Sequence, residues 1–195
     1  MLESHLEEAG FRIQLLHDAA GEYSNTDRWV IQPHGSTLRI GVVDGSSRSG
    51  HPALQWAPSE VAAIITNCAS EGEDLTTTQE AVSERGGFKH SSVATADCRV
   101  QDGEVTWEAL TAGSCEVWGA NTIHSVPTLR GGGKGEASLK RGKDRVVIVS
   151  TDGCLISEAV SHNVSVADLD EWFKSVRERE GRDDITCVIA YRDTE

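Results

Sequence analysis

The chain has 195 residues, of which 38% are apolar and 25% charged, and this composition indicates one soluble domain, residues 1–195, with a sizeable core. Its net charge of −13 argues against general binding to nucleic acid or to an anionic membrane, because both need a basic surface. No apolar run approaches the roughly 18 residues of a membrane span. Residues 1–8 are acidic and lack the apolar core of a secretory signal, and the five cysteines form no Cys-x-x-Cys pair. We therefore expect a cytoplasmic protein with reduced thiols.

Strand patterns recur along the whole chain, as alternation of apolar and polar residues or as short apolar runs between turn formers. The predicted strands cover residues 11–15, 29–31, 38–44, 93–100, 105–109, 116–118, 145–152 and 185–191. The turn formers at 33–36 join the second and third strands into an antiparallel hairpin. Asp102-Gly103 is a strong two-residue hairpin turn between the fourth and fifth strands.

Apolar residues at helical spacing predict three helices. The first covers about residues 58–70, with Pro58 in its first turn, where a missing N–H is harmless. A weaker pattern covers 75–84, and a third helix begins with a capping box at Ser165 and ends at Gly181.

The Gly-rich, basic segment 121–144 predicts a mobile loop or a hairpin. The order of the elements predicts an α+β fold, in which two mostly antiparallel sheets pack as a sandwich with helices outside.

Three of the apolar runs carry an aspartate at one end. Asp44-Gly45 follows the run that begins at Leu38, Asp152-Gly153 follows the run that begins at Arg145, and Asp183-Asp184 precedes the run 185–190. Each Asp-Gly pair alone would indicate a structural turn. Together, carboxylates at three strand ends suit a hard divalent cation such as Mg²⁺ or Mn²⁺, and a glycine lets its carbonyl approach the same ion.

Four segments, in order, resemble motifs of the PP2C family of metal-dependent serine/threonine phosphatases. They are Asn25-Thr26-Asp27-Arg28, Val43-Asp44-Gly45, Ser150-Thr151-Asp152-Gly153 and Arg182-Asp183-Asp184-Ile185-Thr186. The resemblance extends over nearly the whole chain and is strongest to the compact bacterial members that act in stress-response and sporulation signalling.

The resemblance implies an αββα sandwich with two Mn²⁺ or Mg²⁺ ions at one edge. Asp44 would bridge both ions, the Gly45 carbonyl would bind one, and Asp152 and Asp183 would hold the other. Asp27 would bind a metal-bound water or complete the ligand shell, and Asp184 would lie behind the ligands. Two ions about 3.5–4 Å apart can activate a shared water molecule for in-line attack on phosphorus, so no protein nucleophile is needed.

Three positions depart from the family's pattern. Glu22 stands where bacterial members usually carry an arginine that holds the substrate phosphate, and Ser114 stands where an aspartate is often tied to a third metal. Ser46 replaces a histidine of many eukaryotic members. Candidate replacements, each of them equally an ordinary surface residue, are Arg28 and Arg48 for the phosphate and His51, His90 and His124 for proton donation.

The sequence thus predicts a Mn²⁺- or Mg²⁺-dependent phosphatase for phosphoserine or phosphothreonine, with a bacterial signalling protein as its substrate. One alternative is a PP2C-like module that binds a phosphoprotein with weak or no hydrolysis, which Glu22 and Ser114 favour. Another is a hydrolase of small phosphoesters. The basic residues of segment 121–144 either face solvent or contact the phosphoprotein. Asp44, Asp152 and Asp183 favour the enzyme, and we expect their carboxylates to converge.

Overall fold

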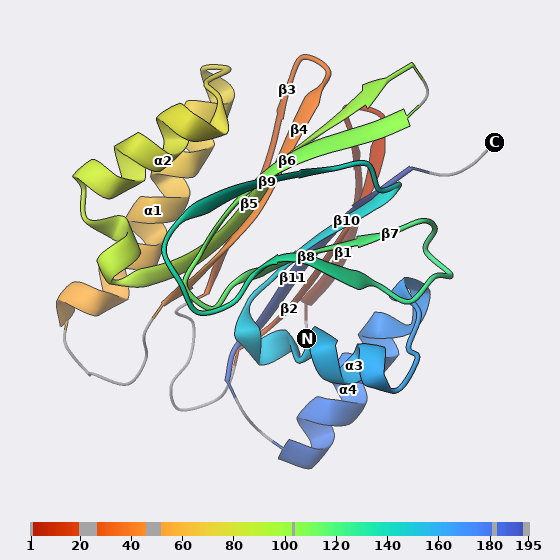
Figure 1. The fold of residues 1–195 in the computed structure, drawn as a ribbon. Coiled ribbons are helices and arrows are strands. Elements are labelled where there is room, and N and C mark those ends of the chain that lie inside the picture. Colours follow the sequence, from red (N-terminus) through yellow and green to blue (C-terminus); the bar gives the residue numbers. More distant parts are fainter. Residues whose placement is uncertain (1, 20–26, 46–51, 103, 181–182, 193–195) are drawn as a thin grey trace.

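The computed structural model describes residues 2–19, 27–45, 52–102, 104–180 and 183–192, which form two sheets packed face to face with helices on both outer faces (Figure 1). This α+β sandwich is the predicted fold class. Neighbouring strands in both sheets are antiparallel.

Within the described residues, one sheet has six strands in the order β1-β2-β11-β10-β7-β8, and the other has five in the order β3-β4-β5-β6-β9. The first sheet contains β1 (Leu2–Glu8), β2 (Phe11–Asp18), β7 (Glu116–Ala120), β8 (Thr128–Gly132), β10 (Val146–Ser150) and β11 (Ile185–Tyr191). The second contains β3 (Arg28–His34), β4 (Thr37–Gly45), β5 (Ser91–Gln101), β6 (Glu104–Ala112) and β9 (Ser138–Gly142). The helices are α1 (Pro52–Ser70), α2 (Leu75–Glu84), α3 (Ile156–Ser161) and α4 (Leu169–Glu180).

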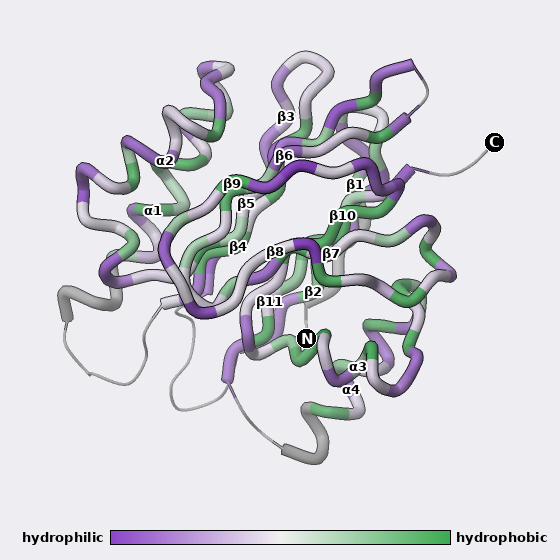
Figure 2. Tube along the Cα trace, viewed as in Figure 1, coloured by the Kyte–Doolittle hydropathy of each residue, from purple (hydrophilic) through white to green (hydrophobic). Residues whose placement is uncertain are grey.

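Strand β10 explains why its sequence is apolar without alternation. Val147 and Val149 pack into the core between the sheets, whereas Val146 and Ile148 pack into the core under α3 and α4. A strand covered on both faces needs apolar side chains on both. Figure 2 shows hydrophobic residues concentrated along the central strands of the two sheets. A third hydrophobic core joins α1 and α2 to the second sheet.

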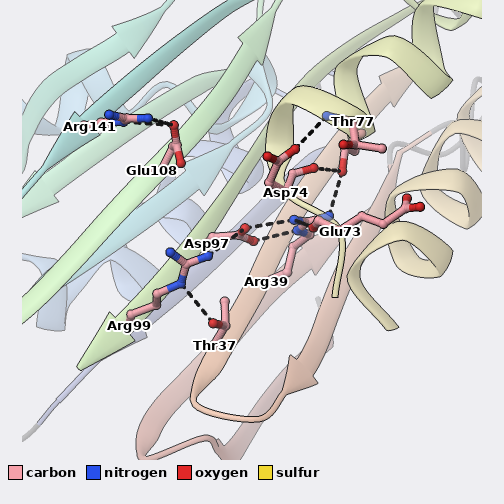
Figure 3. Close-up of polar contacts among 10 residues, drawn as sticks. Thr37, Arg39, Glu73, Asp74, Thr77, Asp97, Arg99, Glu108 and Arg141 are labelled. Atoms are coloured by element: carbon pink, nitrogen blue, oxygen red, sulfur yellow. Dashed lines mark hydrogen bonds and ion pairs between the residues drawn. The ribbon is translucent and has the colours of Figure 1, made fainter. Parts of the chain in front are cut away.

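A buried ion pair ties the α1–α2 connection to strand β4 (Figure 3). Arg39 donates from Nε and Nη2 to both carboxylate oxygens of Asp97 on β5, at 2.6 and 2.8 Å. Its Nη1 donates to the Thr78 hydroxyl at 2.8 Å, and Nη2 also reaches the Glu73 carbonyl at 2.7 Å. Arg39 and Asp97 are only 2% and 4% exposed, so each offsets the lost hydration of the other.

Segment 121–144 differs from the predicted loop or hairpin, because β8 and β9 pair with different sheets. Strand β8 extends the first sheet beside β7, and β9 extends the second beside β6 (Figure 1). The buried Asp144 joins the two sheets on this side. It accepts hydrogen bonds from the Trp107 indole N–H at 3.0 Å and from Arg130 Nη2 at 2.6 Å.

Other predicted elements are confirmed with changed boundaries. Helix α1 begins at Pro52, so the prediction of Pro58 in a first turn is wrong, and Pro58 lies inside the helix. Pro52 instead takes the first position, where proline is equally suited. Ser165 is the N-cap residue of a 3₁₀ turn before α4, but the predicted capping box is wrong, because its side chain makes no cap hydrogen bond and its hydroxyl instead donates to the Asp168 carboxylate at 2.5 Å. The sequence analysis predicted neither β1 nor α3.

The five cysteines are buried free thiols, as predicted. Within the described part of the chain, none of the helices has the length and apolarity needed to cross a bilayer.

Candidate metal centre

Strands β4, β10 and β11 carry the predicted metal-binding aspartates to one end of the sandwich. Asp44 lies at the end of β4, whereas Asp152 follows β10 and Asp183 precedes β11, its antiparallel neighbour. Strand β4 packs against both β10 and β11 across the core between the two sheets. Burial, followed by the charges of Asp27, Asp152 and Asp183, raises the pKa of Asp44 to about 8. The carboxylates are therefore close enough to repel one another.

Gly153 explains how the Asp152 and Asp183 segments come so close. A Cβ added at Gly153 would lie 2.0 Å from the Asp184 carbonyl oxygen and 3.5 Å from the Asp183 Cβ. The Thr151 N–H donates to the carbonyl of Thr186 at 3.0 Å. Any side chain at Gly153 would push the two acidic segments apart.

Asp27 is only 2% exposed and lies beside this group. Thr186 donates its hydroxyl hydrogen to Asp27 Oδ2 at 2.8 Å. Burial raises the pKa of Asp27 to about 7. The hydrogen bond from Thr186 lowers this pKa, whereas the charges of Asp184 and Asp183 raise it further. A buried carboxylate with a pKa near neutrality is suited to binding a cation or a water molecule.

Ser114 contacts Asp44 from the turn between β6 and β7. Its hydroxyl lies 3.3 Å from Asp44 Oδ2 and 3.0 Å from the Ser92 hydroxyl, and its N–H donates to the Ser92 oxygen at 3.1 Å. A neutral hydroxyl therefore lies beside Asp44 at the position where the family pattern has an aspartate. It supplies a hydrogen bond without adding negative charge.

The donor set fits hard divalent cations, because it consists of carboxylates and a backbone carbonyl. Among the residues that the structure describes, however, no three histidine, cysteine or acidic side chains stand in an arrangement that could hold a metal ion. The predicted ligand roles of Asp44, Gly45, Asp152 and Asp183, and the predicted catalytic role of Asp27, stay predictions.

Several candidate residues lie outside the described part of the chain: Glu22, Asn25, Ser46, Arg48, His51 and Arg182. Arg28 is described, and it donates from Nη1 to the Asp27 carbonyl at 2.7 Å and from Nε to the Ser59 hydroxyl at 2.9 Å. It therefore stands next to the candidate centre. His90 and His124 are exposed.

His17 was missed by the sequence analysis. It lies on β2, is 9% exposed, and its Nδ1 lies 2.9 Å from the Thr186 hydroxyl that binds Asp27. No local pattern marks it, because it is one polar residue in a strand and its partner is 169 positions away.

No family model and no curated protein matches the chain. Solved structures do match in fold. RsbX in complex with magnesium has a TM-score of 0.73 and 15% identity, over 97% of this chain and 98% of that one. The RsbU and RsbW domains of a Mycobacterium tuberculosis protein have a TM-score of 0.71 and 16% identity, over 98% of this chain and 62% of that one.

The catalytic domain of the serine/threonine phosphatase PstP, in complex with two manganese ions, has a TM-score of 0.60 and 14% identity, over 94% of this chain and 99% of that one. Phosphatase domains thus match this chain from end to end in the architecture that the four motifs predicted. The chain has the compact fold of the bacterial PP2C-type serine/threonine phosphatases.

Proposed function

We propose that the chain is a metal-dependent phosphatase that hydrolyses phosphoserine or phosphothreonine on a protein. The observation that carries this proposal is the placement of the acids at one end of the sandwich: Asp44 at the end of β4, Asp152 after β10 and Asp183 before β11. Burial, followed by the charges of Asp27, Asp152 and Asp183, raises the pKa of Asp44 to about 8, in keeping with this placement. Four acids held at one end of a sandwich repel one another unless cations lie between them, and oxygen donors suit Mn²⁺ or Mg²⁺.

In this proposal Asp44, Asp152, Asp183 and the Gly45 carbonyl would hold the two ions. When bound, the ions would lower the pKa of the attacking water molecule and offset charge on the phosphoryl oxygens. Asp27 would orient the attacking water molecule or complete the ligand shell. The water oxygen bonds to phosphorus as the bond to the serine or threonine oxygen breaks, and a proton from the water passes to the leaving oxygen, so no side chain of the protein bonds to phosphorus.

The neighbouring structures support this proposal in two ways. RsbX was solved with magnesium and PstP with two manganese ions, which are the cations that this donor set would take. We also propose a bacterial signalling phosphoprotein as the substrate and a cytoplasmic location, and the match in fold to RsbU and RsbW domains is compatible with both.

A phosphoprotein-binding module with little or no hydrolysis is the second candidate. Ser114 favours it, because a hydroxyl contacts Asp44 where an aspartate could help to hold a third ion. Glu22 favours weak hydrolysis as well, because it stands where bacterial members of the family usually carry an arginine that holds the substrate phosphate.

The decisive experiment measures hydrolysis of p-nitrophenyl phosphate and of a panel of phosphoserine and phosphothreonine proteins with Mn²⁺. We expect slow turnover of the small substrate with a high KM, because a missing charge-assisted contact costs about 1.5–3 kcal/mol, or roughly ten- to a hundredfold in affinity. Asp152→Asn should abolish turnover. The matched control Asp170→Asn, which removes only a partly exposed partner of Lys174 on α4, should retain it.

If the wild-type protein binds phosphoproteins in Mn²⁺ but hydrolyses none of these substrates, the module is correct and the enzyme is not.

A further inference from the structure

A line of hydrogen bonds leads from His17 to Asp27 through Thr186. His17 on β2 and Thr186 on β11 are direct partners in the antiparallel register. His17 Nδ1 lies 2.9 Å from Thr186 Oγ1, which in turn lies 2.8 Å from Asp27 Oδ2. The three residues are 9%, 0% and 2% exposed, so water does not compete for these contacts.

The direction of both hydrogen bonds follows once Asp27 is ionised, that is, above its pKa of about 7. An ionised carboxylate only accepts, so the single hydrogen of the Thr186 hydroxyl is donated to Asp27. The Thr186 oxygen must then accept from His17, which requires the hydrogen of the imidazole to be on Nδ1. The His17 ring packs at 4.9 Å from the Trp29 ring, tilted by 46°, so its position is held from one side as well.

The middle residue of this line is itself fixed to the segment that carries Asp152. The Thr186 N–H donates to the Thr151 hydroxyl at 3.1 Å, and its carbonyl accepts from the Thr151 N–H at 3.0 Å and from Cys154 Sγ at 3.1 Å. The Thr186 hydroxyl is therefore held at a fixed distance from the acidic end of β10. Its hydrogen bond to Asp27 therefore restrains where the Asp27 carboxylate lies.

We propose that His17 is a positioning residue, which orients the Thr186 hydroxyl so that the Asp27 carboxylate keeps one orientation toward the candidate metal centre. This proposal rests on the proposed function, because it assigns Asp27 a task there. His17 itself contacts neither substrate nor metal, and it acts only through Thr186. Side chains that orient metal ligands or their water typically matter ten- to a hundredfold in metal affinity or activity.

The first test needs no activity. In the metal-free protein, at a pH above the Asp27 pKa of about 7, ¹⁵N-edited NMR of the imidazole should find the hydrogen of His17 on Nδ1. Thr186→Val keeps the shape of the side chain but removes the hydroxyl, and should release this preference, whereas Thr186→Ser should retain it. A His17 ring with its hydrogen on Nε2 in the wild-type protein would overturn the proposal.

The second test compares Mn²⁺ affinity by calorimetry and turnover of p-nitrophenyl phosphate. We expect Thr186→Val to lower Mn²⁺ affinity or kcat by roughly ten- to a hundredfold with little change in KM, and Thr186→Ser to recover most of the loss. His17→Leu should repeat the loss, and His17→Asn should restore much of it, because the asparagine amide can donate from near the Nδ1 position. This second pair also serves if Thr186→Val does not fold.

Failure of the positioning role and failure of the proposed function give different results. Folded Thr186→Val and His17→Leu proteins with wild-type Mn²⁺ affinity and kcat would refute the positioning role alone. A wild-type protein that binds Mn²⁺ without hydrolysing any substrate would refute the enzyme, and the NMR and Mn²⁺ affinity comparisons would still decide the role of His17.

Discussion

Removing the charge of Asp44 should stabilise the metal-free protein, although the same change should destroy its response to metal. The perturbation is Asp44→Asn, measured by urea unfolding in EDTA at pH 5, 6.5 and 8. Burial and the charges of Asp27, Asp152 and Asp183 raise the pKa of Asp44 from 3.8 to about 8. A tenfold change in an equilibrium is about 1.4 kcal/mol, so ionised Asp44 costs the folded state on the order of 5 kcal/mol.

The direction in which stability changes with pH follows from which state, folded or unfolded, holds the Asp44 proton more tightly. The folded protein keeps the Asp44 proton to higher pH than the unfolded chain does, so the stability from this group is complete below about pH 4. It is lost as the pH rises through about 8. Asp27, with a pKa of about 7, adds to the same trend. The metal-free wild-type protein should therefore lose stability between pH 5 and pH 8.

An amide at position 44 carries no charge, so Asp44→Asn should lose less stability over this range. At pH 8 in EDTA we expect it to be more stable than the wild-type protein by about 2–4 kcal/mol, less than the full cost because a partly buried amide needs partners of its own. Millimolar Mn²⁺ should reverse the order, because a ligand that binds only the folded state stabilises it by mass action. The reasoning is refuted if wild-type stability in EDTA is the same at pH 5 and pH 8, or if Asp44→Asn is the less stable protein at pH 8.

Two further substitutions test how the scaffold holds this centre. Arg39→Met leaves the buried Asp97 with only the largely exposed Arg99, at 3.9 Å, as a cationic partner, so we expect a loss of about 3–5 kcal/mol in urea unfolding, part of which Arg39→Met/Asp97→Leu should recover; a loss below about 1 kcal/mol would contradict the role of this pair. Gly153→Ala would bring a Cβ to 2.0 Å from the Asp184 carbonyl oxygen, so it should abolish the Mn²⁺-induced rise in melting temperature even where the protein still folds; an unchanged rise would mean that the segment of Asp152 tolerates displacement.

The ends of the central strands were predictable because their signals are local. The runs before Asp44 and Asp152, and the run after Asp183, are apolar on both faces since both faces are covered in the sandwich. Such a run predicts a strand wherever it pairs, and the acid at its end then marks the edge. Helix α2 also matches its predicted bounds, Leu75–Glu84, because its apolar spacing is local information.

Strands β8 and β9 were not predictable in the same way. Their side chains are mostly exposed, and their sequence combines glycines with basic residues in place of alternation. They are strands because the edges of β7 and β6 offer unpaired backbone groups, which is a property of the assembled sheets. The prediction that Pro58 lies in the first turn of a helix was wrong for a related reason. Pro52 and Pro58 are both compatible with a helix start, and local rules do not choose between them.

The contacts around Asp27 lie beyond sequence reasoning for a different reason. Thr186 is 159 positions from Asp27 and 169 from His17. The residue types do not indicate such partners, because a threonine in a strand is ordinary and a single histidine is most often a surface residue. The resemblance placed Thr186 in a motif, but only the register of β2 against β11 brings His17 to it.

The charge at this end of the sandwich also constrains the choice between enzyme and binding module. A phosphate carries negative charge, and Asp44, Asp152 and Asp183 would repel it as they repel one another. A module that recognised phosphate here would therefore need cations as much as an enzyme would. Binding of a phosphoprotein that depends on Mn²⁺ would support the metal centre under either function, and turnover alone would separate the two. Binding that persists unchanged in EDTA would contradict both, because the phosphate would then be held by a different surface.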